Sequence, residues 1–137
     1  MAQQNKEELE NIKATLDRHN LGYFSPKDEN LCDPDSDVGF QDQVFDGNIK
    51  GLADCDWMIC NTRNKDMGSI FEAGYFHSLG KPIVYFCAGL PEGAAFNLML
   101  AQSGVKVCTS TEELNDYLHR CDAEGKLLFE PYYGNIE

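Results

Sequence analysis

Two carboxylates lie six positions apart in the segment Asp66-Met-Gly-Ser-Ile-Phe-Glu72. The segment follows an apolar run and opens a stretch with helical spacing, and Gly68 and Ser69 mark the turn between them. An ionised carboxylate can attack an anomeric carbon, and a second carboxyl group can hold a proton for the leaving group. Two successive displacements of this kind retain the anomeric configuration. One hypothesis is therefore that Glu72 is a nucleophile and Asp66 an acid, and that both act on a glycosidic bond.

A structural explanation of the same residues competes with the catalytic one. Ser69-x-x-Glu72 matches a capping box, in which the glutamate side chain accepts a hydrogen bond from the backbone N–H of the serine. In the first helical turn, the helix dipole would also favour the ionised form of Glu72. Spacing alone leaves both hypotheses open.

The elements that position these residues follow from hydrophobic periodicity. Short apolar runs at 57–60, 82–87 and 105–108 predict buried strands, and Leu21–Phe24 is a further strand candidate. Residues 27–43 are expected to form a long polar loop. The alternation predicts an α/β fold with a parallel sheet that helices cover on both faces. Ligands bind such sheets at the carboxyl ends of the strands, which is where the 61–66 loop and the next helix begin. Helices are predicted over residues 4–18, 41–53, 69–79, 96–102 and 111–120.

Composition limits the class of protein. The 137 residues suffice for one domain, which we place at residues 1–137. The net charge of −12 argues against a nucleic-acid polymer or an anionic membrane as partner, but not against an uncharged nucleoside. The N-terminus is polar, and no apolar run approaches the roughly 20 residues of a membrane span, so a cytoplasmic location is expected. The six cysteines lack the spacing of a zinc site, and we expect reduced thiols, no metal and no cofactor.

Several motifs together resemble the nucleoside 2-deoxyribosyltransferase family, and the resemblance covers nearly the whole chain. The pattern of an aspartate, a glycine and a glutamate combined with Asn-Leu-Met is fairly specific, whereas either alone would be weak. The matching segments are Asp66-x-Gly-x-x-x-Glu72-x-Gly-Tyr75, Gly80-Lys-Pro82, Phe96-Asn-Leu-Met99, Asn48-x-x-Gly51-Leu52 and Tyr132-Tyr-Gly134.

The resemblance implies a flavodoxin-like (Rossmann-like) fold and a ping-pong transfer of 2-deoxyribose from a deoxynucleoside to a free nucleobase. Glu72 would form the deoxyribosyl-enzyme intermediate, while Asp66 would bind the base and pass its proton. Asn97 would hold the sugar 5′-hydroxyl, with Met99 packing nearby. In the family a neighbouring subunit contributes this helix, so the resemblance also implies a homo-oligomer, either a dimer or a hexamer built from dimers.

Further substrate contacts are predicted around these groups. Asn48 stands where the family usually has an aspartate; an amide can hydrogen-bond the base or sugar but cannot accept a proton. Asp46 is close enough in sequence to compensate. Gly68 lies in the turn beside the expected substrate. Phe40, together with Tyr23 and Phe24, is a candidate for stacking on the base.

A second departure concerns the first strand of the family, which has no counterpart in this sequence. A start codon assigned too late, or a truncated chain, would explain the missing strand. The alternative is a sheet in which the Leu21 strand pairs directly with the Trp57 strand. Because the missing segment normally lines the base pocket, two alternatives to transfer stay open. One is an N-glycosidase, in which water replaces the acceptor base, and the other is a non-catalytic nucleoside-binding module.

Overall fold

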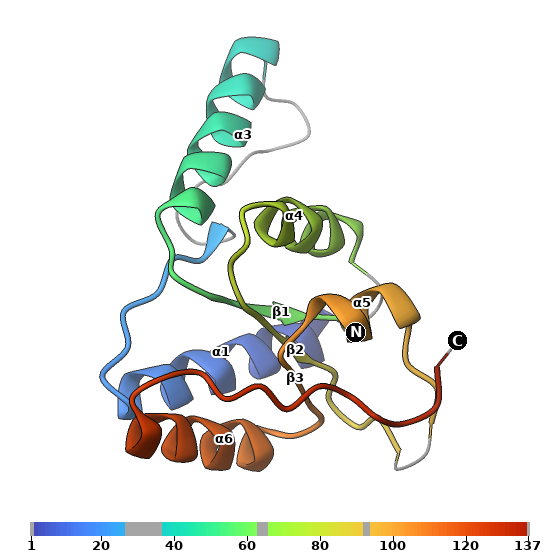
Figure 1. Ribbon diagram of the computed structural model, residues 1–137. Coiled ribbons are helices and arrows are strands. Elements are labelled where there is room, and N and C mark those ends of the chain that lie inside the picture. The colour runs from blue at the N-terminus through green and yellow to red at the C-terminus, as the bar shows by residue number, and fades with distance from the viewer. Residues whose placement is uncertain (1, 27–36, 63–65, 92–93, 137) are drawn as a thin grey trace.

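The computed structural model describes residues 2–26, 37–62, 66–91 and 94–136 (Figure 1). All five predicted helices are present, although their ends differ from the prediction, and the three apolar runs form strands. The helices are α1 (Ala2–Arg18), α3 (Val38–Ala53), α4 (Met67–Ser78), α5 (Leu98–Ser103) and α6 (Thr111–Glu124). The strands are β1 (Met58–Asn61), β2 (Ile83–Phe86) and β3 (Lys106–Cys108).

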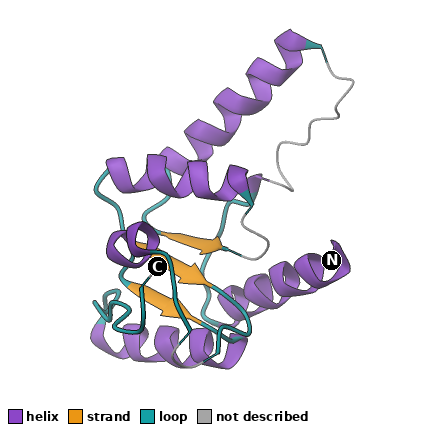
Figure 2. Ribbon diagram, turned by 90° about the vertical axis from the view of Figure 1, so that its right-hand side faces the viewer, coloured by secondary structure: helices purple, strands orange, loops and turns teal. Residues whose placement is uncertain are grey.

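The three strands form one parallel sheet in the order β1-β2-β3. The central strand β2 is buried along its whole length, with all four side chains at 0–1% exposure. Its alternate residues point to opposite faces. Val84 and Phe86 join the core under α1 and α6, whereas Ile83 and Tyr85 join the core with α4 and α5. Helices therefore lie on both faces of the sheet, which confirms the predicted α/β fold (Figure 2).

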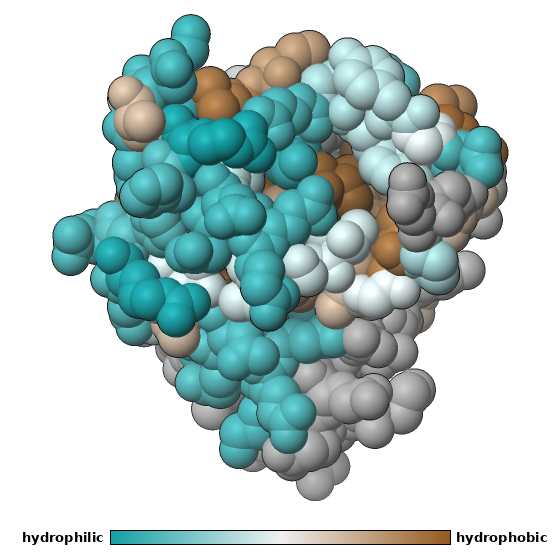
Figure 3. All heavy atoms as spheres, turned by 90° about the horizontal axis from the view of Figure 1, so that it is seen from below, coloured by the Kyte–Doolittle hydropathy of each residue, from teal (hydrophilic) through white to brown (hydrophobic). Residues whose placement is uncertain are grey.

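The lower face of the sheet is covered by α1 and α6, which pack against each other. Ile12 and Leu16 are four residues apart on α1, so both point to the sheet, where they meet Leu114 and Tyr117 of α6. The opposite sides of these helices face solvent, and the surface seen from below is mainly hydrophilic (Figure 3). In the described ranges, no helix is long and apolar enough to cross a membrane.

The upper face is covered by α4, whose Ala73 and Phe76 are buried against the sheet. Helix α3 contacts α4 and extends away from the sheet beyond it (Figures 1 and 2). It begins at Val38, inside the predicted loop, because the Asp37 side chain accepts a hydrogen bond from the Phe40 backbone N–H at 2.8 Å. The rest of that predicted loop, residues 27–36, lies outside the described residues.

The prediction of a strand at Leu21–Phe24 is wrong. After α1 the backbone turns at Asn20, which has a φ of 59°, and the following segment is extended but pairs with no strand in the described part of the chain. Leu21 and Phe24 still pack against the two cores. A direct pairing of this segment with β1 is also wrong, since a cavity lies between the two.

His19 lies just after α1 and forms hydrogen bonds with two residues of α6. Its Nδ1 lies 2.7 Å from Asp122 Oδ2 and its Nε2 lies 3.0 Å from Asn115 Oδ1. Both partners are acceptors in this arrangement, so both bonds form fully only with the protonated imidazolium. The hydrogen bond to Asp122 raises the pKa of His19 above its ordinary value of 6.5, against the opposing effect of burial.

This raised pKa predicts a pH-dependent stability. A folded-state pKa above the unfolded one gives a contribution that is fully present below pH 6.5 and is lost as pH rises through the folded pKa. We expect wild type to lose about 0.5 kcal/mol of unfolding free energy relative to Asp122→Asn between about pH 5.5 and 8.5. Urea titrations of both proteins at each pH measure the difference. Identical pH slopes in the two proteins would contradict the assignment.

Candidate active site

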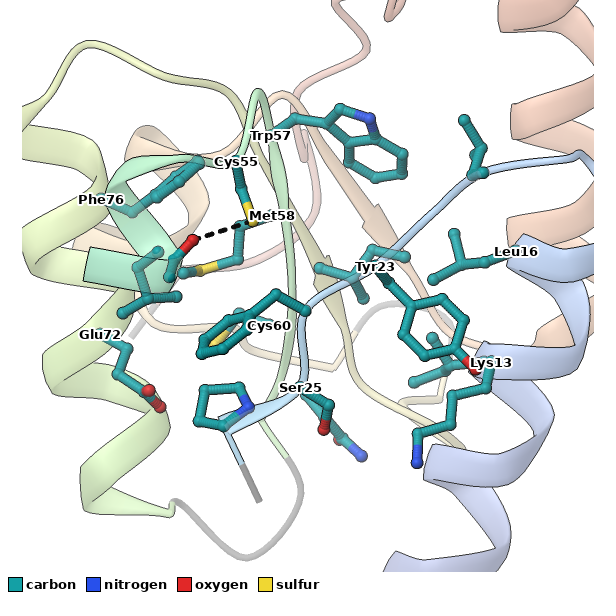
Figure 4. A pocket seen from close by; sticks show the side chains of 18 of the residues that line it. Lys13, Leu16, Tyr23, Ser25, Cys55, Trp57, Met58, Cys60, Glu72 and Phe76 are labelled. Atoms are coloured by element: carbon teal, nitrogen blue, oxygen red, sulfur yellow. Dashed lines mark hydrogen bonds between the residues drawn. The ribbon is translucent and has the colours of Figure 1, made fainter. Parts of the chain in front are cut away.

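A cavity of about 700 Å³ runs along the outer edge of β1, and we call it the β1 trough. Helix α1 and the 20–26 segment form one wall, and β1 with α4 forms the other (Figure 4). The residues of α4 and its cap that line it are Asp66, Ser69, Glu72 and Phe76. Both carboxylates predicted to do chemistry therefore line one cavity, at the end where β1 finishes and α4 starts.

Asp66 is the N-cap of α4. Its Oδ1 accepts hydrogen bonds from the backbone N–H groups of Gly68 at 2.9 Å and Ser69 at 3.4 Å. The helix thus begins at Met67, two residues earlier than predicted, and Ser69 is already its third residue. The capping-box hypothesis is wrong, because the N–H that Glu72 would have bonded donates to Asp66 instead.

Glu72 consequently belongs to the second turn of α4 rather than the first. The unpaired backbone N–H groups and the favourable effect of the helix dipole are confined to the first turn, so neither acts on the Glu72 carboxylate. Ser69 and Phe76 lie three positions before it and four after it, so all three share one helix face, which lines the trough. Figure 4 shows the Glu72 carboxylate directed from α4 into the cavity, across from Tyr23 and Lys13.

The pKa of Cys60 indicates that the Glu72 and Asp66 carboxylates both lie near this thiol. This buried thiol donates to the Ser69 carbonyl oxygen at 3.7 Å. Burial, and then the negative charges of Glu72 and Asp66, raise the pKa of Cys60 to about 12. Cys60 therefore stays protonated at neutral pH and offers no thiolate nucleophile.

The other predicted substrate contacts do not line the trough of their own chain. Asp46 and Phe40 are exposed on α3, and Asn48 is half-buried there, with its Oδ1 enclosed and without a hydrogen-bond partner among the described residues. Asn97 is the exposed N-cap of α5, and its Oδ1 accepts from the Leu100 N–H at 3.2 Å. Met99, on the same helix, is 74% exposed.

Gly68 lies at the start of α4 beside the Asp66 carboxylate. A Cβ at this position would stand 3.4 Å from Asp66 Oδ1, within ordinary contact distance. The turn therefore has room for a small side chain, and Gly68 contributes a backbone donor to the Asp66 cap. A direct contact between Gly68 and substrate remains a prediction.

Lys13, Ser25 and Asn61 are among the polar residues that line the trough without having been named as site residues from the sequence. Asn61 closes β1, and its Nδ2 donates to Glu8 Oε2 of α1 at 3.3 Å. A polar residue directly after an apolar strand is a signal that could have identified it. Lys13 and Ser25 come from separate segments and carry no comparable local signal.

A parallel sheet with paired carboxylates at its carboxyl edge defines an α/β protein whose ligand site lies beyond the strand ends. Residues 1–108 match the family model described as nucleoside 2-deoxyribosyltransferase, and the chain belongs to that family. A similar solved structure is the 2-deoxyribosyltransferase of the psychrotolerant bacterium Bacillus psychrosaccharolyticus. Its TM-score is 0.75 at 21% identity, over 94% of this chain and 90% of that one, which shows a shared fold. A comparison with curated proteins finds no match.

The cap geometry predicts different effects for two substitutions of Asp66. Asp66→Ala removes the acceptor of two backbone N–H groups and should lower the unfolding free energy by about 1 kcal/mol. Asp66→Asn keeps an equivalent Oδ1 and should cost only a few tenths of that. Urea unfolding of the three proteins measures both effects. Equal losses for alanine and asparagine would show that the carboxylate charge, rather than the cap, stabilises this turn.

Proposed function

We propose that this protein transfers 2-deoxyribose between nucleobases through a covalent intermediate on Glu72. The observation that carries the proposal is that the Glu72 carboxylate is directed into the trough from the second turn of α4, where capping does not account for it. A carboxylate oxygen attacks C1′ of the deoxynucleoside, and the C1′–N bond breaks as the base leaves with a proton. A second base then attacks C1′ and releases Glu72, so the configuration is retained.

Asp66 is suited to handle the base in this scheme. Two backbone N–H groups hold its Oδ1 and fix the orientation of the carboxyl group. Its Oδ2 is then the oxygen that exchanges a proton with the leaving and the incoming base. Asp66 and Glu72 would thus divide the work of acid and nucleophile at one end of the trough.

Glu72→Gln separates catalysis from structure. The variant keeps the size and polarity of the side chain but lacks the nucleophilic carboxylate, so we expect transfer to fall by at least about a thousandfold. Its unfolding free energy should stay within about 0.5 kcal/mol of wild type. Chromatography of deoxyinosine or deoxycytidine incubated with adenine follows the formation of deoxyadenosine. Asp66→Asn is the matched partner: it keeps the cap, so it should lose activity while its unfolding free energy falls by only about 0.3 kcal/mol.

The products distinguish the competing functions. Deoxyadenosine that disappears in Glu72→Gln supports transfer through Glu72. Free base and free sugar without a new nucleoside would instead identify an N-glycosidase. Ligand-induced stabilisation of wild type without any product would identify a nucleoside-binding module, and an active Glu72→Gln would reject Glu72 as the nucleophile.

We also propose that the active protein is a cytoplasmic homo-oligomer. Large apolar side chains are exposed on α3, α4 and α5, including Phe45 at 53%, Phe71 at 57% and Met99 at 74%. The Phe45 and Phe71 rings lie 6.2 Å apart and form one apolar patch across α3 and α4. Exposed apolar groups of this size are typical of subunit contacts. Asn97 is exposed and does not line the trough of its own chain, as expected if it serves the site of a neighbouring subunit.

Mixing two inactive variants tests this sharing of Asn97. In a dimer of Glu72→Gln with Asn97→Ala, one of the two sites combines an intact Glu72 with an intact Asn97 of the neighbour. Random exchange makes half of the dimers mixed, so about a quarter of wild-type activity should return after subunit exchange. No recovery, with subunit exchange verified by labelled chains, would place Asn97 in the site of its own subunit or outside the site.

A further inference from the structure

Residues 127–136, which follow α6, form an extended tail along the edge of the sheet that lies away from β1 (Figure 1). The Tyr117 hydroxyl of α6 donates to the Leu128 carbonyl oxygen at 2.7 Å. The Glu130 N–H then donates to the Val105 carbonyl oxygen at 2.8 Å, where the tail passes the start of β3. The first half of the tail is therefore fixed to α6 and to the sheet.

The second half of the tail closes on the segment that directly precedes α5. The Tyr132 hydroxyl donates to the Ala94 carbonyl oxygen at 2.7 Å, and the Tyr132 ring lies 5.6 Å from the ring of Phe96. The Phe96 N–H donates to the Asn135 carbonyl oxygen at 2.9 Å. We call these contacts of Ala94, Phe96, Tyr132 and Asn135 the tail clasp. Phe96 is buried, so the clasp connects the tail to the core.

Gly134 leaves the space that the Tyr132 ring occupies in the clasp. A Cβ at position 134 would stand 2.2 Å from the Tyr132 hydroxyl oxygen and 2.4 Å from its Cζ. Both distances are far below van der Waals contact, so a side chain here would push the Tyr132 hydroxyl away from the Ala94 carbonyl oxygen. The pair Tyr132 and Gly134 therefore acts as one unit in holding the segment before α5.

Asn97 follows Phe96 directly and is the N-cap of α5. Its Oδ1 accepts from the Leu100 N–H at 3.2 Å, and its carbonyl oxygen accepts from the Ala101 N–H at 2.9 Å. Because the cap engages Oδ1, the side-chain donor Nδ2 is the group suited to a ligand oxygen, and the cap sets its direction. Helix α5 has only six residues, and so short a helix has little stability of its own. Its first turn therefore depends on what holds the residues before it.

We propose that Tyr132 and Gly134 are positioning residues for the transfer reaction, which act by holding Asn97. The inference rests on the proposed function, in which Asn97 binds the 5′-hydroxyl of the sugar. The clasp fixes the segment before α5, this segment fixes the cap, and the cap directs Nδ2 towards the hydroxyl oxygen. Loss of the clasp should therefore weaken the contact with the 5′-hydroxyl and leave Glu72, on another helix, in place.

Two donor substrates separate positioning from a general loss of structure. Deoxyinosine and 2′,5′-dideoxyinosine differ only in the 5′-hydroxyl, and each is incubated with adenine as acceptor. Tyr132→Phe keeps the ring but lacks the hydroxyl, so kcat/KM for deoxyinosine should fall roughly fivefold. For the dideoxy donor it should fall less than about twofold, whereas a folding defect would lower both alike. Tyr133→Phe is the matched control, because Tyr133 is 88% exposed, and it should keep wild-type values.

A double-mutant cycle tests whether Gly134 acts through Tyr132. In the wild-type background, Gly134→Ala should displace the ring and reduce the preference for deoxyinosine over the dideoxy donor, as Tyr132→Phe does. In a Tyr132→Ala background the ring is absent, so Gly134→Ala should have no further effect. Equal effects of Gly134→Ala in both backgrounds would contradict the clasp.

Hydrogen exchange without substrate tests the structural step by itself. The Leu100 and Ala101 amides, which donate to Asn97, should exchange roughly fivefold faster in Tyr132→Phe and should be unchanged in Tyr133→Phe. The Leu16 amide of α1, on the other face of the sheet, reports any global change.

The outcomes keep this inference apart from the proposed function. Unchanged exchange at Leu100 and Ala101 in Tyr132→Phe would overturn the clasp, whether or not the protein is active. An active wild type whose preference for deoxyinosine survives Tyr132→Phe or Asn97→Ala would overturn the positioning role while transfer itself stands. An inactive wild type would reject the proposed function, and with it the catalytic part of the inference.

Discussion

The burial of β2 on both faces is the constraint from which the arrangement follows. Ile83, Val84, Tyr85 and Phe86 have almost no exposed surface, so each face of the strand requires a helical layer. Parallel pairing with β1 and β3 then places every carboxyl end at one edge of the sheet. The chain leaves β1 at that edge and enters α4, and Asp66 caps the helix there. The position of both carboxylates is therefore a consequence of how β2 is buried.

The sequence predicted those parts of the fold whose signal is local and strong. Each short, mainly apolar run became a strand, because a strand between two helical layers removes the side chains on both of its faces from water. Leu21–Phe24 has the same local character, and its apolar side chains do pack against the core. It is not a strand because pairing requires a neighbour at hydrogen-bond distance, and the β1 trough separates it from β1. Nothing within these four residues indicates that distance.

The candidate site was predictable to a similar extent. The position of Asp66 and Glu72 between a strand and a helix placed them together. Which residue caps the helix was not predictable, because Asp66 and Ser69 are both good N-cap types and the choice depends on where β1 releases the chain. Lys13 and Ser25 reach the trough from other segments, so only the tertiary structure identifies them. Roles for Asn48, Asp46, Phe40, Asn97 and Met99 stay predictions, since none lines the trough of its own chain.

The proposed chemistry of Glu72 depends on how much water the β1 trough admits beside the reacting groups. A glycosyl ester on Glu72 would be attacked by whichever nucleophile reaches C1′, and in an open trough water competes with the incoming base. Apolar side chains such as Leu16, Ile59 and Phe76 line the trough, so a base that packs against them would displace water from the end beside Asp66 and Glu72. A base that fills the trough well would then shift the partition from hydrolysis towards transfer while the reacting groups stay the same. Transfer and hydrolysis are in this view two outcomes at one site, distinguished by whether a base or water lies beside C1′ of the glycosyl ester.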